Sequence, residues 1–159
     1  MVRESIPEQV LMLKSWEGEF AQKLHCLIPT PRATKRLINS YRILKAGLSM
    51  LELEAFQGTQ QQPGNFQLPL LLLALLIYDP IRSSHWFCHW LQQARLDPDL
   101  NLQTLLAELQ PDAPGRIAEQ LHSIVNAPGF PASASLLLQW IPLVARFSFD
   151  CAQAIDAAD

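Results

Sequence analysis

The sequence predicts an all-α protein, a compact multi-helix domain of about six or seven helices. Three observations predict it. Leucine and alanine dominate the longest apolar run, residues 68–78, in which β-branched residues are nearly absent. Short breaks that contain Pro, Gly or Asp separate apolar segments of helical length along the chain. Hydrophobic residues make up 49% of the 159 residues, enough for a sizeable core and too many for a disordered chain.

The first half of the chain predicts two helices and a loop. Ser5 can cap a first helix, whose apolar stripe continues to about Leu27. A central helix is expected over residues 31–55, with Gly47 as a soft point. Residues 56–67 are rich in Gln, Gly and Pro, and therefore predict an exposed loop.

The second half predicts shorter helices between frequent breaks. Residues 68–78 are apolar nearly all round, which predicts a helix buried at the centre. Further helices are expected over residues 81–95, 100–109, 116–125 and 133–149, the last kinked or divided by Pro142. The small and acidic tail, residues 151–159, is expected to fray, and residues 1–159 are expected to form one domain.

The start of the central helix carries an unusual charge pattern. Thr30 is a good N-cap and Pro31 suits the first helical position. A helix N-terminus favours acidic residues, yet Arg32, Lys35 and Arg36 follow with no acidic residue among them. Such charges repel the helix dipole by roughly a few tenths of a kcal/mol each unless an anion is near. The pattern predicts a phosphate or carboxylate site.

A helical projection at about 100° per residue separates this segment into two faces. The apolar stripe consists of Leu37, Tyr41, Leu44 and Leu48. The polar face consists of Arg32, Lys35, Arg36, Asn39 and Arg42. The alternative interpretation is an ordinary solvated basic face on an amphipathic helix.

Residues 30–42, Thr-Pro-Arg-x-x-Lys-Arg-Leu-Ile-Asn-x-Tyr-Arg, resemble a helix near the C-terminal end of bacterial P-loop NTPases similar to the KAP family. Residues 140–149 and the apolar run ending at residues 77–80 resemble later parts of the same region, so that the resemblance covers residues 29–149. Proteins of this kind carry a helical lid after the nucleotide-binding core. The resemblance implies that Arg32 acts as a sensor arginine that reaches the nucleotide phosphates.

The same resemblance implies supporting roles for other residues of the chain. Lys35 and Arg36 would assist at the phosphates or meet an acidic surface. Asn39, Arg42 and Arg146 would contact a partner. The sequence departs from the family because it contains no Gly-x-x-x-x-Gly-Lys-Ser/Thr phosphate-binding loop. ATP and magnesium are therefore expected only together with a P-loop partner, and no catalytic residue is assigned to this chain.

Composition excludes several other classes of protein. A net charge of −3 argues against a general nucleic-acid binder. The longest apolar run is too short to cross a bilayer, which takes about 20 residues. Three cysteines without framework spacing, and a charged start without an apolar leader, predict a reduced cytoplasmic location.

Two further constellations and one further class of function remain as alternatives. One helix face carries residues at the spacing of metal ligands: His85, Cys88 and His89. The neighbouring aromatic residues, Trp86, Phe87 and Trp90, favour an aromatic core instead, so no metal is assigned. Cys88 and His89 could be a nucleophile pair, but sequence neighbours point apart on a helix and no third group is evident. The alternative function is a free-standing helical adaptor that binds a protein partner, or a second copy of the chain, through an apolar groove.

Overall fold

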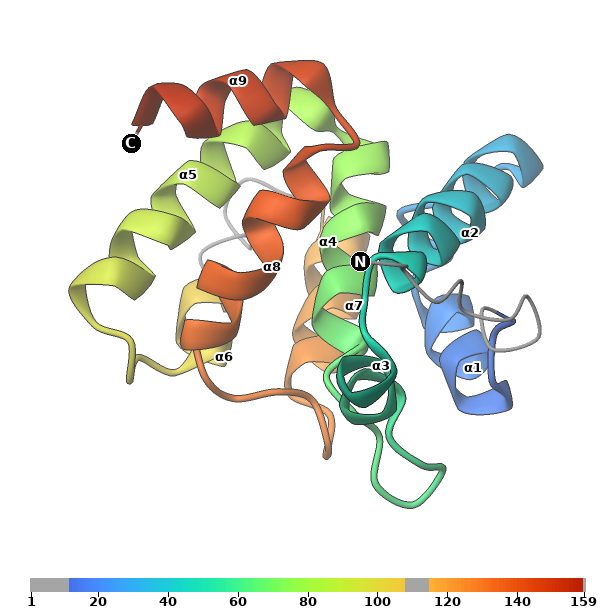
Figure 1. Ribbon diagram of the computed structural model, residues 1–159. Coiled ribbons are helices and arrows are strands. Elements are labelled where there is room, and N and C mark those ends of the chain that lie inside the picture. The colour runs from blue at the N-terminus through green and yellow to red at the C-terminus, as the bar shows by residue number, and fades with distance from the viewer. Residues whose placement is uncertain (1–11, 108–114, 159) are drawn as a thin grey trace, which may run out of the picture.

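The computed structural model describes residues 12–107 and 115–158 and is all-α over these ranges (Figure 1). The expected fold class is confirmed, but the described ranges contain nine helices rather than six or seven. The helices are α1 (Ser15–Lys23), α2 (Pro31–Ala46), α3 (Met50–Gln57), α4 (Gln67–Tyr78), α5 (Pro80–Leu96), α6 (Leu102–Leu106), α7 (Gly115–Val125), α8 (Ser135–Ala145) and α9 (Phe149–Ala158). No described helix is long and apolar enough to cross a membrane.

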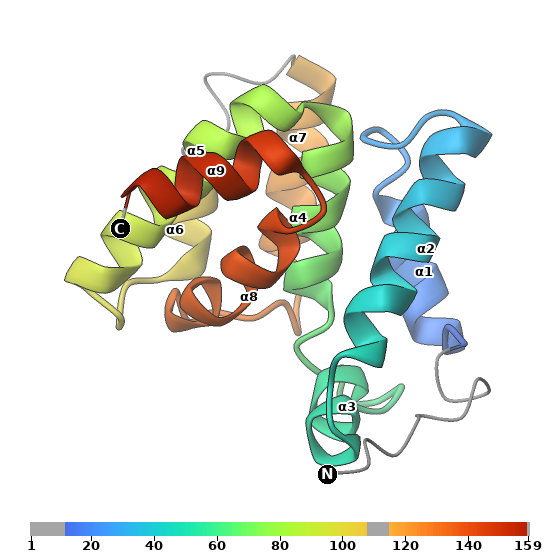
Figure 2. The same ribbon diagram turned by 45° about the horizontal axis from the view of Figure 1, so that its top comes forward.

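Helix α4 forms the centre of the molecule, as its apolar composition predicts. Its residues from Gln67 to Leu76 are all buried. Helix α2 packs against α4 from one side, while α5 and α8 pack against it from the other (Figure 2). A helix with no polar face requires neighbours on every side. The surrounding helices therefore take their positions from α4.

The central helix expected over residues 31–55 is two helices in the structure. Helix α2 ends at Ala46, and Ser49 begins α3 after a short turn at Gly47. The Ser49 hydroxyl accepts a hydrogen bond from the Glu52 N–H at 3.2 Å, and the Glu52 carboxylate accepts one from the Ser49 N–H at 2.7 Å. This capping box starts a new helix and overrides the continuous apolar pattern.

The exposed loop expected over residues 56–67 is shorter in the structure, because both of its ends are buried. Phe56 and Phe66 belong to the core, and the Phe66 N–H bonds the Phe56 carbonyl at 3.0 Å. The turn between them closes tightly at Gly58, which has φ of +63°, a value that favours glycine. A Cβ atom at Gly58 would lie 2.2 Å from the Gly64 nitrogen, so the turn has no room for a side chain there.

The two chain ends also differ from expectation. Helix α8 ends at Ala145, with Pro142 inside it, and a separate helix α9 follows. The tail expected to fray is this helix, which packs on α5 and α8 and buries Cys151 and Ile155. At the other end α1 begins at Ser15, while the expected cap at Ser5 lies outside the described residues.

Candidate functional site

The start of α2 has the local structure that the sequence predicts. The Thr30 hydroxyl accepts a hydrogen bond from the Ala33 N–H at 3.1 Å, which confirms Thr30 as the N-cap. Pro31 is the first helical residue, and the Thr34 N–H bonds the Thr30 carbonyl at 3.0 Å. Within the described part of the chain, the Arg32 N–H is therefore the one backbone donor of this first turn without an acceptor. An anion here would depend mainly on side-chain charge.

Three exposed cations surround this helix start, and we call Arg32, Lys35 and Arg36 the α2 basic cluster. None of the three forms an ion pair or a side-chain hydrogen bond with any residue that the structure describes. The first turn contains no acidic residue that could neutralise them. The cluster is therefore an uncompensated positive charge at the positive end of a helix dipole.

The other residues expected to act with the cluster are placed differently. Asn39 is exposed on the same helix. Arg42 is half-buried and already engaged in an interaction within the protein. Arg146 is exposed at the C-terminal end of α8, a helix that packs on α4, α5 and α9. No contact between α8 and α2 is among the main helix contacts of the described residues.

Helix α5 provides an internal comparison, because it also begins with a cap followed by proline. Its N-cap is Asp79, whose carboxylate accepts a hydrogen bond from the Arg82 N–H at 3.0 Å. The other Asp79 oxygen lies 3.5 Å from Nε of Arg82. The arginine at this helix start is thus matched by an internal carboxylate. The corresponding cap of α2 is a neutral threonine, so Arg32 is left without such a match.

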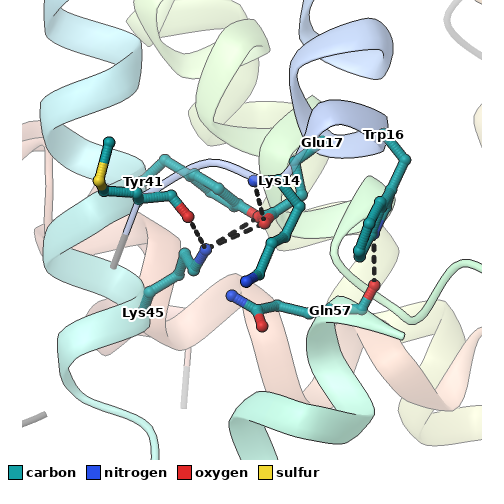
Figure 3. A network of polar contacts seen from close by, with 7 residues as sticks. Lys14, Trp16, Glu17, Tyr41, Lys45 and Gln57 are labelled. Atoms are coloured by element: carbon teal, nitrogen blue, oxygen red, sulfur yellow. Dashed lines mark hydrogen bonds and ion pairs between the residues drawn. The ribbon is translucent and has the colours of Figure 1, made fainter. Parts of the chain in front are cut away.

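The opposite face of α2 is fixed by a buried polar network around Glu17 of α1 (Figure 3). Lys45 and Glu17 are both fully buried, and Nζ of Lys45 lies 3.0 Å and 3.1 Å from the two carboxylate oxygens. The Tyr41 hydroxyl donates a short hydrogen bond to the same carboxylate. Glu17 also accepts a hydrogen bond from the Lys14 N–H at 3.0 Å. Every link in this set is charge-assisted, which makes the α1–α2 contact directional as well as apolar.

Burial changes the proton affinity of both partners of Glu17. Burial away from water is the main cause that raises the pKa of Tyr41 far above its ordinary value of 10.0, and the negative charge of Glu17 is the second. Burial lowers the pKa of Lys45, against the opposing effect of Glu17. Both effects follow from the cost of holding a charge away from water. Tyr41 is thus a neutral donor, and Lys45 depends on Glu17 to remain charged.

Sequence reasoning missed this network, although it placed Tyr41 on the inward stripe. The signal that could have found it is Lys45 itself, which follows Tyr41 by four residues and therefore lies on the same apolar stripe. A lysine on a buried stripe requires a carboxylate partner. That the partner is Glu17 could not be inferred, because the pairing of α1 with α2 is a tertiary contact.

The cysteine and histidine constellation on α5 is partly as expected. Phe87 and Trp90 are buried, which confirms the aromatic core, but His85 and His89 are exposed rather than packed. Burial raises the pKa of the Cys88 thiol, which disfavours the thiolate that a nucleophile needs. Among the described residues, no group of three or more His, Cys, Asp or Glu side chains is arranged to hold a metal ion.

An apolar groove lies between α1 and α2, next to this network. Its volume is 350 Å³. It is lined by Leu13, Gly18, Ala21, Gln22, His25, Ile28, Thr34, Leu37 and Ile38. The groove bears on the adaptor alternative, because an adaptor requires an accessible apolar surface.

Comparisons with known proteins add no relative to these observations. No protein-family model matches the chain, and no curated protein or solved structure is significantly similar to it. What the chain does is therefore inferred from its own residues and contacts.

Proposed function

We propose that the chain is a helical lid-type accessory domain, like the C-terminal region of KAP-like P-loop NTPases, whose Arg32 contacts the phosphates of a nucleotide held by another module. The single observation that supports the proposal is the uncompensated positive charge of the α2 basic cluster. Arg32, Lys35 and Arg36 are exposed, and none has a partner in the described part of the chain. An anion supplied from outside would remove their repulsion with the helix dipole.

The chemistry of such a contact follows from the side chains available. A guanidinium group presents several N–H donors in a planar fork that matches phosphate oxygens. Arg32 would stabilise negative charge that develops on a transferring phosphoryl group. Lys35 and Arg36 would support it or meet an acidic surface of the partner. The chain would not hydrolyse nucleotide alone, because its sequence has no phosphate-binding loop, and ATP and magnesium would be held by the P-loop partner.

The position of the cluster suits a contact of this kind. A phosphate-sensing arginine must be held on a rigid element, or its contact is lost to side-chain and backbone entropy. The first turn of α2 is fixed by its Thr30 cap, and its far end is fixed by the buried Lys45–Glu17 pair. The cluster is therefore exposed on a helix that is held at both ends.

The direct test uses inorganic tripolyphosphate, which has phosphate groups but no base, and records backbone amide shifts by NMR. We expect tripolyphosphate to shift the amides of the first turn of α2, above all that of Arg32. Arg32→Ala should weaken binding about two- to fivefold, as expected for a contact of about 0.5–1 kcal/mol at an exposed site. Arg82→Ala is the matched control, because this arginine also starts a helix but lies beside Asp79.

The result that contradicts the proposal is equal binding by wild type and Arg32→Ala. A stronger test becomes possible once a P-loop partner is identified. In the intact assembly Arg32→Ala should reduce ATP turnover while the circular dichroism spectrum of this chain is unchanged. Turnover at the wild-type rate would remove the sensor role.

The adaptor function is the second candidate, favoured by the apolar groove between α1 and α2. The two functions differ in what controls assembly. Size-exclusion chromatography with light scattering, with and without ATP, separates them. A stable homodimer that ignores ATP favours the adaptor. A monomer whose α2 amides respond to tripolyphosphate favours the accessory domain.

A further inference from the structure

A second cavity lies on the other side of α1 from the groove, and neither the phosphate contact nor the adaptor function involves it. Its volume is 370 Å³, within the range of about 300–1,000 Å³ that is typical of small-molecule sites. Its walls come from α1, the turn that follows α1, the first residue of α4, the second half of α7 and the turn that follows α7. Gln67 and Gln120 both line it, and we call it the Gln67/Gln120 cavity.

Two side-chain amides in this cavity lack hydrogen-bond partners. Gln67 is only 9% exposed, and its carboxamide has no partner among the described residues. The Gln120 side-chain oxygen is buried and also has none. A buried polar group without a partner costs about 1–3 kcal/mol, and native proteins rarely retain one without a reason. The buried Gln120 oxygen indicates that something else completes its hydrogen bonding, and the nearby Gln67 carboxamide is available to the same molecule.

The other residues that line the cavity indicate which kind of molecule could complete these hydrogen bonds. Lys23 and His25 provide cationic or hydrogen-bonding groups at one wall, and Ser123 adds a hydroxyl. No carboxylate is among the described residues that line the cavity. Phe20, Ile124 and Pro128 supply apolar surface. The lining thus combines positive charge, neutral donors and acceptors, and an apolar wall.

The walls are held in place by contacts that do not involve the lining amides. The Phe20 ring meets Phe66 edge-on, with centroids 5.8 Å apart, and lies 6.4 Å from the Phe130 ring. In the turn after α7 the Phe130 N–H bonds the Ala127 carbonyl at 3.2 Å. The cavity is therefore formed before anything enters it, which lowers the entropic cost of binding.

We infer that the Gln67/Gln120 cavity binds a small organic anion with a planar hydrogen-bonding ring, such as a nucleoside monophosphate. A carboxamide offers one donor and one acceptor side by side, which is the pattern that glutamine uses to pair with the edge of a nucleobase. The ring would lie against the apolar wall, and the anionic group would lie near Lys23 and His25. This inference does not depend on the α2 basic cluster, which lies on a different helix.

The test titrates the wild-type chain with adenosine, guanosine, cytidine and uridine monophosphates, observing the side-chain amide signals of Gln67 and Gln120 by NMR. We expect at least one monophosphate to bind about tenfold more tightly than both its own nucleoside and inorganic phosphate. If none of the four shifts these signals at about 5 mM, the inference is wrong.

Variants then assign the contacts. Gln67→Leu and Gln120→Leu should each weaken binding about tenfold, while thermal unfolding occurs at the same temperature or higher, because an unpaired amide is replaced by an apolar group. Gln103→Leu is the control for binding, since Gln103 also has a buried side-chain oxygen without a partner but does not line the cavity. Its Nε2 donates to the Pro131 carbonyl at 3.3 Å, so this control is compared for binding and not for stability. If a leucine variant fails to fold, Lys23→Ala at the exposed rim still tests the inference. This variant should abolish the preference for monophosphate over nucleoside, and an unchanged preference would contradict the inference.

The two proposals fail separately. Arg32→Ala should leave monophosphate binding at the Gln67/Gln120 cavity unchanged, whereas it weakens binding of tripolyphosphate. Monophosphate binding that is lost in Arg32→Ala and retained in Gln67→Leu would place the ligand at α2 and overturn the inference about the cavity.

Discussion

Glu17 joins α1 to α2 in a buried setting, where its carboxylate meets three donors. It accepts hydrogen bonds from Tyr41, Lys45 and the Lys14 N–H. Glu17→Ala should lower the free energy of unfolding by about 3–5 kcal/mol, since it leaves Lys45 buried without its counter-charge, with only the Met12 carbonyl 3.4 Å from its Nζ. Urea denaturation measures this directly.

A double variant separates charge from packing in this network. Glu17→Leu combined with Lys45→Met replaces the ion pair by apolar groups of similar size, and it should recover most of the stability that Glu17→Ala loses. If the double variant is as unstable as Glu17→Ala, the ion pair itself stabilises the fold. The unpaired charge of Lys45 is then not the main reason why Glu17→Ala is destabilised.

Tyr41 makes the same network sensitive to alkaline pH. Its pKa is raised by folding, so above the ordinary value of 10.0 the unfolded chain has lost a proton that the folded chain retains. Stability is therefore fully present below that pH and falls above it, by about 1.4 kcal/mol per pH unit. The lowered pKa of Lys45 acts in the opposite sense, but only up to its ordinary value of 10.5.

The comparison that isolates Tyr41 is therefore made above about pH 10.5, where the lysine effect has ended. Tyr41→Phe should be less stable than wild type at neutral pH by about 1.5–3 kcal/mol, because it loses a hydrogen bond to a charged group. Its stability should decline less steeply than that of wild type from pH 10.5 upward. Parallel declines in guanidinium denaturation would show that Tyr41 does not hold its proton in the folded state.

At the scale of elements, the start of α2 differs from that of α5 in the charge of its cap residue as well as in its number of cations. Thr30→Asp should place a carboxylate cap near Arg32, as Asp79 does near Arg82, although Arg32 follows its cap by two residues and Arg82 follows its cap by three. It should raise the free energy of unfolding by about 0.3–1 kcal/mol, because a carboxylate suits a helix N-terminus. It should also weaken tripolyphosphate binding at least as much as Arg32→Ala does, since the helix then carries its own anion.

A variant that gains stability and loses binding cannot be explained by damage to the fold. Asn101→Asp is the matched control, because Asn101 caps α6 through the N–H groups of Gln103 and Thr104 and should leave binding unchanged. Unchanged binding in Thr30→Asp would mean that the phosphate does not lie at the start of α2.

Which elements could be predicted depended on how local their determinants are. The burial of α4 and the Thr30 cap were predicted, because a continuous apolar run and a Thr-Pro pair act within a few residues. The break before α3 was missed because the Ser49-x-x-Glu52 capping box competes with an apolar pattern that continues through it. Helix α9 was missed because its alanines give a weak periodic signal, although Cys151 and Ile155 are buried against neighbouring helices.

The candidate site was also predictable only where its determinants are local. The residues of the α2 basic cluster lie on one turn, so their proximity could be inferred from spacing alone. Their lack of an internal partner could not be inferred, because a carboxylate from any other helix could have met them. The Gln67/Gln120 cavity is not predictable from the sequence, since the sequence favours an exposed loop up to Gln67 and an ordinary helix around Gln120.

At the scale of the whole molecule, α9 closes the side of the core formed by α5 and α8. Cys151 is fully buried in this contact, and burial raises the pKa of its thiol. In a chain that carries Cys26→Ser and Cys88→Ser, Cys151 should therefore react with a thiol reagent far more slowly in the folded state than in urea. Labelling at the rate of the denatured chain would mean that α9 is undocked in solution.

The buried ion pair also limits where the polypeptide can be cut. Glu17 precedes the Pro29-Thr30-Pro31 turn and Lys45 follows it, so a fragment that begins at α2 would keep the lysine and discard its counter-charge. Such a fragment must either expose that side chain or release its proton, and both weaken its hold on α4. The helix that bears the cationic start can be transplanted into another protein only together with the helix before it.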